Sequence, residues 1–199
     1  TGLSLNYVLG NSIDASATAS WNAGAGFAPI GKNTGPFTGT FDGLGYSISG
    51  LTINRPSTAD VGLFGFLDGG TLRNISLLGG SISGSDYVGG LVGDNYYGTI
   101  DTAYSAISIS GRNKVGGLVG YNNGNISNSH VTGNVSGVNY VGGLIGSNNQ
   151  YNITNTYATG TVSGGNDVGG LVGYSYYGNF SNVYATGDVS GSTNIGGLI

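Results

Sequence analysis

The amino-acid sequence predicts an all-β protein built as a parallel β-solenoid, in which one chain coils into stacked rungs of about 27 residues. Three observations support this: a Val-Gly-Gly-Leu-Val/Ile-Gly motif recurs at nearly constant spacing, glycine fills 42 of 199 positions, and only 7% of residues are charged. Abundant glycine opposes long helices, and short repeated units bury a continuous core by stacking on one another. We expect three short strands per rung and a right-handed coil.

The repeats occupy the second part of the chain. Copies or shortened forms of the motif start at Val61, Val88, Val115, Val141, Val168 and Ile195, at spacings of 27, 27, 26, 27 and 27 residues. An Asn/Tyr/Gly loop, a second β-favouring segment and a short Val-Ser-Gly-type segment follow the motif, separated by turn residues. We therefore assign residues 61–199 to five repeats plus the start of a sixth.

The residues before Val61 lack the 27-residue motif but keep its composition. The segment 37–53 alternates apolar and polar residues, makes a tight turn, and alternates again. This pattern predicts that residues 1–60 form the irregular first rungs of the same solenoid. Because the sequence lacks an initiator methionine and ends inside a motif, we expect it to be a piece of a longer chain.

Aligned repeats predict columns of like side chains along the stack. Two columns are apolar: the valines that open each motif, and the set Leu72, Ile100, Ile126, Ile153 and Phe180. A polar column of Asn74, Thr102, Asn128, Asn155 and Asn182 is expected to form a ladder of bonded amides, and the alternative is a row that faces a ligand. A ring column of Tyr104, His130, Tyr157 and Tyr184 is expected to stack, and the alternative is sugar binding. Arg73 and Asp101 share a column and are expected to form a surface ion pair.

Composition excludes several functional classes. The absence of cysteine excludes disulfide frameworks and thiolate zinc sites. Five basic against nine acidic residues exclude a large surface for nucleic acid. No apolar run approaches the roughly 20 residues of a membrane span, so no membrane insertion is expected.

Catalysis is also not expected. Parallel β-helices host polysaccharide lyases and hydrolases, and glycoside hydrolysis needs two carboxylates about 5–9.5 Å apart. Asp86, Asp94, Asp101, Asp167 and Asp188 lie at different positions of the repeat, and His130 has no motif that would supply a nucleophile. We expect no catalytic residue, no metal site and no cofactor.

Two other ligands have weak support. Residues 164–167 faintly resemble a calcium-binding nonapeptide repeat, but the pattern does not recur. Ice binding would need a flat regular threonine array, and only Thr132, Thr159 and Thr186 align.

The repeated motif resembles a known family. Val-Gly-Gly-Leu-Val-Gly is similar to the GLUG motif, and residues 27–53 resemble the segment that commonly precedes GLUG repeats; together the resemblance covers about Tyr7 to Ile199. Both occur in large secreted bacterial adhesins similar to filamentous haemagglutinin, many of them exported by two-partner secretion.

The resemblance implies a non-enzymatic, rigid stalk of a secreted or cell-surface protein that acts in adhesion or biofilm matrix. It also implies an outer-membrane secretion transporter as a partner, acting through parts of the chain not present here. GLUG repeats accompany peptidase and other modules too. The alternative is therefore a non-catalytic repeat module of a secreted carbohydrate-active enzyme or peptidase.

The loops after the motif are the candidate binding residues. Aromatic and amide side chains recur there at one edge of successive rungs: Tyr96, Tyr97, Tyr121, Asn122, Asn123, Tyr151, Tyr174, Tyr176 and Tyr177. Flat aromatic faces with amide donors and acceptors suit saccharides, and tyrosine also suits protein contacts. The expected ligand is an exopolysaccharide or a host-surface glycan or protein. The alternative is that these residues only form the turns between strands and bind nothing.

Overall fold

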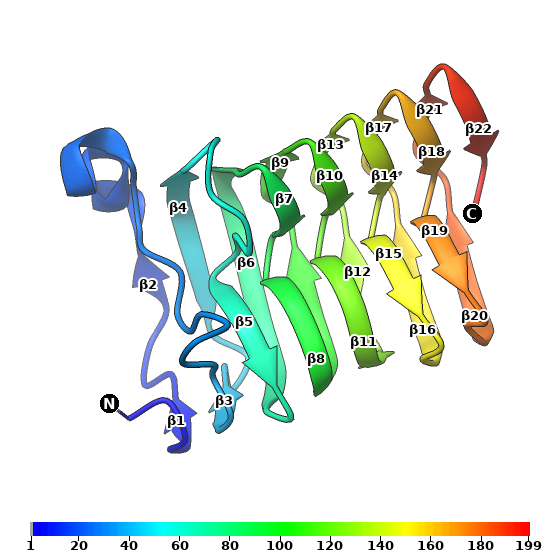
Figure 1. Ribbon diagram of the computed structural model, residues 1–199. Helices are drawn as coiled ribbons and strands as arrows, with labels where there is room; N and C mark the ends of the chain where they lie inside the picture. The colour runs from blue at the N-terminus through cyan, green and yellow to red at the C-terminus, as the bar shows by residue number, and fades with distance from the viewer. Residues whose placement is uncertain (1) are drawn as a thin grey trace.

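The computed structural model describes residues 2–199, and their chain winds around one axis from the N-terminal to the C-terminal end (Figure 1). The strands are joined through parallel ladders, which form one 17-stranded and one five-stranded sheet. The one helical element among the described residues is a 3-10 segment, η1 (Ser16–Gly24), broken by non-helical backbone at Trp21, Asn22 and Ala23. The predicted parallel β-solenoid is confirmed.

The strands lie in four rows along the axis. The first row is the five-stranded sheet: β7 (Asp86–Gly89), β10 (Asn113–Gly116), β14 (Asn139–Gly142), β18 (Asn166–Gly169) and β22 (Thr193–Gly196). The second row follows the motif turn: β5 (Phe64–Asp68), β8 (Val92–Ser105), β11 (Val119–Ser127), β15 (Ile145–Asn149) and β19 (Val172–Tyr176).

The other two rows complete each rung. The third row holds β1 (Tyr7–Val8), β2 (Ile13–Asp14), β3 (Thr40–Asp42), β6 (Thr71–Ser83), β12 (His130–Val131), β16 (Ile153–Ala158) and β20 (Phe180–Ala185). The fourth row holds β4 (Ser47–Asn54), β9 (Ser108–Ser110), β13 (Val135–Ser136), β17 (Val162–Ser163) and β21 (Val189–Ser190). The long strands β4, β6, β8 and β11 extend across two rows.

The rungs that open at β14 and β18 therefore contain four strands, where three were expected. The motif is the cause, because its Gly-Leu pair turns the chain and places the two halves of the motif in different rows. Gly142, for example, ends β14 and Ile145 begins β15.

The register follows the sequence period. Val115 pairs with Val88 on one side and with Val141 on the other, and Val168 continues the column. These four valines are at most 1% exposed. Complete burial of such a side chain contributes about 1.5–3 kcal/mol. The second apolar column is also in register, and its members from Leu72 to Ile153 are buried. Both predicted columns are confirmed.

The motif glycines allow backbones to touch. A Cβ on Gly117 would lie 2.3 Å from the carbonyl oxygen of Gly143 in the next rung. A Cβ on Gly120 would lie 2.4 Å from the amide nitrogen of Val88. The second contact presses the start of a second-row strand against the first-row strand of the preceding rung. Side chains from these two rows therefore share one surface.

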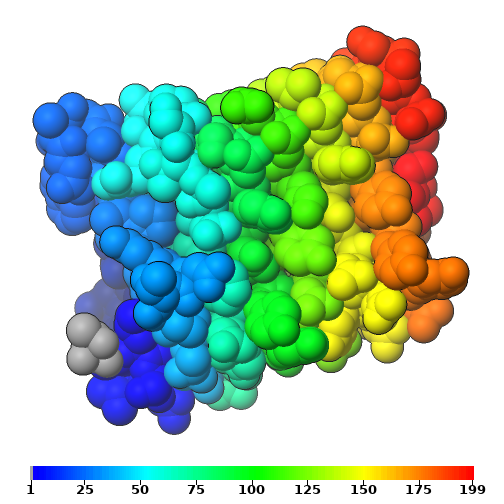
Figure 2. All heavy atoms as spheres, viewed as in Figure 1, coloured from blue at the N-terminus to red at the C-terminus, as the bar shows by residue number. Residues whose placement is uncertain are grey.

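The chain before Val61 stacks on the repeats with longer coils. Tyr7 pairs with Phe41 and Ile13 with Ile48, while Phe41 in turn pairs with Leu72. The 3-10 segment lies beside this end of the solenoid (Figure 1). In the space-filling view successive rungs form adjoining bands across the visible face (Figure 2).

Candidate functional site

Three columns of side chains from the first and second rows lie next to one another, and we call them together the tyrosine face. The first column precedes each motif: Asp60, Tyr87, Lys114, Tyr140, Asp167 and Asn194. The second follows each motif: Phe66, Asp94, Tyr121, Ser147 and Tyr174. The third lies two residues further on: Asp68, Tyr96, Asn123, Asn149 and Tyr176.

The first column has an unusual backbone. Every member has a positive φ, between 52° and 55°. This left-handed conformation kinks the chain just before the valine of the motif. Together with the glycine contact described above, the kink brings first-column side chains against second-column side chains of the following rung.

Two tyrosine pairs show this contact. The rings of Tyr87 and Tyr121 pack edge to face with centroids 5.8 Å apart, and those of Tyr140 and Tyr174 do so at 5.5 Å. The Lys114 ammonium lies 4.7 Å from the centroid of the Tyr87 ring and 4.2 Å from that of Tyr121. Such cation–π contacts contribute about 0.5–1 kcal/mol when exposed and more when desolvated.

Asp94 is a half-buried carboxyl beside this cluster. Its Oδ1 atom is buried without a hydrogen-bond partner among the described residues. Burial, and then the charge of Asp60, raise the pKa of Asp94 from its ordinary 3.8 to about 7, while Lys114 opposes the shift. Burial likewise raises the pKa of Asp60 and lowers the pKa of Lys114. The charge of Asp60 therefore acts directly on the Asp94 carboxyl.

The predicted loop edge is partly exposed. Tyr96, Tyr97, Tyr174, Tyr176 and Tyr177 are 39, 55, 43, 47 and 78% exposed, and Tyr121, Asn123 and Tyr151 are half-buried. The rings of Tyr96 and Tyr97 lie 4.1 Å apart, and those of Tyr176 and Tyr177 lie 4.5 Å apart.

Asn122 is the exception, because its side chain is completely buried and does not face a ligand. It accepts a hydrogen bond from Asn95 Nδ2 (2.8 Å), and its own Nδ2 donates to Asn148 Oδ1 (2.8 Å) and to the Gly124 carbonyl (2.7 Å). A polar side chain remains buried at low cost when its hydrogen bonds are made inside the protein. Asn122 therefore belongs to an internal ladder.

Sequence reasoning did not identify Tyr87, Lys114, Tyr140 and Ser147 as members of the tyrosine face. Three of them precede the motif, and only the contact between backbones of adjacent rungs brings them beside the loop residues. The signal available in the sequence was the recurrence of bulky residues directly before the valine of the motif.

The predicted ring ladder is confirmed, and the predicted amide ladder is confirmed from Asn128 to Asn182, whereas Asn74 and Thr102 bond to Asp42 and Asp101 instead. Asn182 donates to Asn155 and Asn155 to Asn128, each at 3.0 Å, and Asn128 donates to Asp101 at 2.8 Å. The rings of the second ladder stack with centroids 4.5 Å (Tyr104–His130), 4.6 Å (His130–Tyr157) and 4.9 Å (Tyr157–Tyr184) apart. Burial lowers the pKa of His130.

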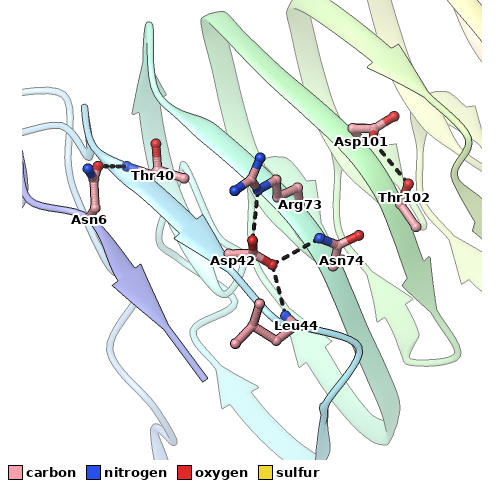
Figure 3. Close-up of polar contacts among 8 residues, drawn as sticks. All are labelled: Asn6, Thr40, Asp42, Leu44, Arg73, Asn74, Asp101 and Thr102. Atoms are coloured by element: carbon pink, nitrogen blue, oxygen red, sulfur yellow. Dashed lines mark hydrogen bonds and ion pairs between the residues drawn. The ribbon is translucent and has the colours of Figure 1, made fainter. Parts of the chain in front are cut away.

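The predicted ion pair between Arg73 and Asp101 is not formed. The Arg73 Nε instead donates to Asp42 Oδ2 at 2.8 Å, on the opposite side of the rung (Figure 3). Asp42 also accepts from Asn74 Nδ2 and from the Leu44 amide, each at 2.9 Å. The Asp101 carboxylate instead accepts hydrogen bonds from hydroxyl and amide groups of its own rung and the next. These donors include the Thr102 hydroxyl and the Asn128 side-chain amide.

The described residues 2–199 contain no cluster of three or more His, Asp or Glu side chains able to hold a metal ion. Over the same residues, no helix is both long and apolar enough to cross a bilayer.

The GLUG motif model matches residues 111–136, 137–163 and 164–190, which follow one another along the solenoid. These segments are GLUG repeats. Halomucin of Haloquadratum walsbyi is 48% identical over 96 residues, 44% of this chain and 1% of halomucin. An Evansella cellulosilytica protein provisionally named a Gly-rich membrane protein is 44% identical over 82 residues, 39% of this chain and 9% of that protein. The chain thus spans a small part of the length of both relatives.

One solved structure has a similar fold. A Bacteroides ovatus protein provisionally named an immunoglobulin A1 protease superimposes with a TM-score of 0.59, covering 95% of this chain and 70% of that chain at 19% identity. At this identity the likeness concerns the fold alone.

Proposed function

We propose that this β-solenoid of GLUG repeats is a non-enzymatic segment of a secreted or cell-surface bacterial adhesin, similar in kind to filamentous haemagglutinin. In this proposal the coil is a rigid stalk, and the tyrosine face contacts polysaccharide in adhesion or in a biofilm matrix. Export through an outer-membrane secretion transporter belongs to the same proposal and would depend on other parts of the protein.

The observation that carries the proposal is the row of exposed tyrosines on a stiff scaffold. Tyr96, Tyr97, Tyr176 and Tyr177 present rings at one edge of rungs whose backbones are bonded in register. An exposed aromatic ring leaves apolar surface in contact with water. Several exposed rings along one edge therefore indicate a surface that contacts another molecule. Loops and edges on a rigid scaffold are also where binding usually occurs.

A second candidate function is a non-catalytic repeat module of a secreted carbohydrate-active enzyme or peptidase. The fold likeness to the Bacteroides ovatus protein favours it. Under both candidates this segment binds or spaces and performs no chemistry of its own.

The non-enzymatic assignment has its sharpest test at Asp94, whose raised pKa and neighbour Asp60 are features shared by catalytic acids. We expect no release of reducing ends or unsaturated products when the segment is incubated with polysaccharides. Turnover that disappears in Asp94→Asn would contradict the assignment.

Binding is tested with a panel of matrix polysaccharides and host glycans. A variant carrying Tyr→Ala at positions 96, 97, 176 and 177 should lose binding, because it removes the exposed rings. A control with Ala at Tyr7 and Tyr46, which are exposed outside the tyrosine face, should retain it. Binding should depend weakly on salt, since the substituted tyrosine rings that contact the ligand carry no charge. Retention of all binding by the first variant, with an unchanged fold, would leave the segment as a spacer only.

A further inference from the structure

A hollow of about 320 Å³ opens on the tyrosine face. Its lining includes Lys114, Tyr121, Tyr140, Ser147, Asn149 and Tyr174. This volume lies at the lower end of the range for small-molecule sites, about 300–1,000 Å³. It suits one ring of a larger molecule better than an entire extended ligand.

A serine in a column of larger side chains creates the hollow. Ser147 pairs in register with Tyr121 on one side and with Tyr174 on the other. The two tyrosines are therefore two rungs apart, about 9.6 Å at the usual strand spacing of about 4.8 Å. A saccharide ring in van der Waals contact with both, at about 4 Å on each side, fits this interval.

Polar groups are available around this space. Within residues 2–199, neither the Ser147 hydroxyl nor the Lys114 ammonium has a hydrogen-bond or ion-pair partner in the protein. Asn149 donates through Nδ2 to Asn123 Oδ1 at 3.3 Å, which leaves its own Oδ1 as an acceptor. Donors and acceptors between aromatic walls are the features that orient a polyol.

The surrounding charge favours an uncharged ligand. The Lys114 cation lies near Asp94 and Asp86. Burial lowers the pKa of Lys114, and the charges of these two carboxylates partly offset that effect. Asp60 adds a further acidic group beside Asp94. An anionic sugar would meet this acidic surrounding, whereas a hydroxyl can accept a hydrogen bond from Lys114 without a net charge.

Extending the proposed function, on which this inference rests, we propose that the hollow binds one neutral hexose unit of a polysaccharide that lies along the tyrosine face. Tyr121 and Tyr174 flank the ring, and Ser147, Asn149 and Lys114 bond its hydroxyls. Adjacent units of the polymer contact the exposed tyrosines, including Tyr176, which borders the hollow.

The test fills the hollow. Ser147→Tyr puts a tyrosine ring into the hollow, the same side chain that the column has on either side, at Tyr121 and Tyr174. Its matched control is Ser76→Tyr, which makes the same change in the ring column, directly beside Tyr104 and away from the hollow. Tyr174→Leu serves as a second variant that removes one wall without filling the space.

The probes are neutral tetrasaccharides and hexasaccharides of glucose, mannose and galactose, with uronic-acid oligosaccharides as the charged arm, and titration calorimetry gives the affinity. Circular dichroism verifies the fold of each variant. Ser147→Tyr and Tyr174→Leu should each weaken neutral binding at least about tenfold, which corresponds to about 1.4 kcal/mol. Ser76→Tyr should leave the affinity unchanged.

The outcomes separate the two proposals. If folded Ser147→Tyr and Tyr174→Leu keep neutral binding while the quadruple tyrosine variant loses it, the hollow is not the site and the proposed function stands. Binding of the uronic-acid probes alone would overturn the neutral-ligand assignment. Equal losses in Ser147→Tyr and Ser76→Tyr would overturn the location. If the wild-type chain binds no saccharide, the proposed polysaccharide contact of the tyrosine face and the proposed hexose site are both wrong.

Discussion

The internal asparagine ladder allows the most quantitative test of how the rungs are held together. Asn95, Asn122 and Asn148 are buried in successive rungs, and their amides bond in one direction along the axis at 2.8 Å. We expect Asn122→Ala to interrupt the ladder at its centre. The same change at Asn152, an exposed residue that accepts one bond of 3.1 Å from Asn179, is the matched control.

The magnitude follows from the groups left without partners. Asn122→Ala removes the donor to Asn148 Oδ1 and to the Gly124 carbonyl, and the acceptor of Asn95 Nδ2. Asn95 Nδ2 keeps only a 3.5 Å contact to the Gly98 carbonyl. Each buried unsatisfied group costs about 1–3 kcal/mol, so with three groups affected the free energy of unfolding should fall by about 3–9 kcal/mol. Asn152→Ala exposes its lost partner to water and should cost under about 1 kcal/mol.

Urea unfolding followed by far-ultraviolet circular dichroism measures both variants. Because each repeat contacts only its neighbours, the Asn122→Ala transition should also broaden as adjacent rungs unfold separately from the remainder. A loss below about 1 kcal/mol, or an equal loss in both variants, would show that water or local rearrangement satisfies the ladder and that the stack does not depend on it.

Three further changes test other parts of the fold. Val141→Asp places an unpaired charge in the valine column, and its melting temperature should fall steeply with loss of the neighbouring rungs; an unchanged value would contradict burial. Gly120→Ala forces a Cβ against the backbone of the preceding rung and should destabilise by more than about 2 kcal/mol in urea, whereas Gly35→Ala, with open space around it, should be nearly neutral. Because the pKa of Asp94 is about 7 in the folded protein against 3.8 ordinarily, folding takes up a proton in that window. The unfolding free energy should therefore decrease as pH rises from about 4 to about 7, and Asp94→Asn should reduce this slope; equal slopes in urea titrations would refute the assignment.

The fold was predictable because stacking in register turns a period in the sequence into a column in space. Once the spacing of Val88, Val115 and Val141 was known, a parallel coil followed, and so did the ladders at Asn155 and His130. The strand count per rung was less predictable, because the Gly-Leu turn inside the motif has no proline or Asn-Gly signal to distinguish it from a continuous strand.

The candidate site was only half predictable, for a different physical reason. Loop tyrosines such as Tyr96 were found from composition, but Lys114 and Tyr140 come from another row and meet the loops only through a contact between backbones. Asn122 was misplaced because an asparagine in a loop is ordinarily exposed. Its burial depends on partners about one period away in the sequence, Asn95 and Asn148, whose alignment places all three inside the coil.

The first column of the tyrosine face supports a role for its side chains beyond turn formation. Tyr87, Lys114 and Tyr140 hold φ values of 55°, 54° and 55°, where a side chain costs roughly 1–2 kcal/mol and glycine costs almost nothing. The chain uses glycine at 42 positions, and Gly45 and Gly79 have the same sign of φ. The edge-to-face and cation–π contacts return about 0.5–1.5 kcal/mol each, which roughly cancels the backbone cost. Folding alone therefore gives little reason to keep tyrosine and lysine there in place of glycine. A surface that binds a ligand supplies the reason, and the saccharide titrations test it directly.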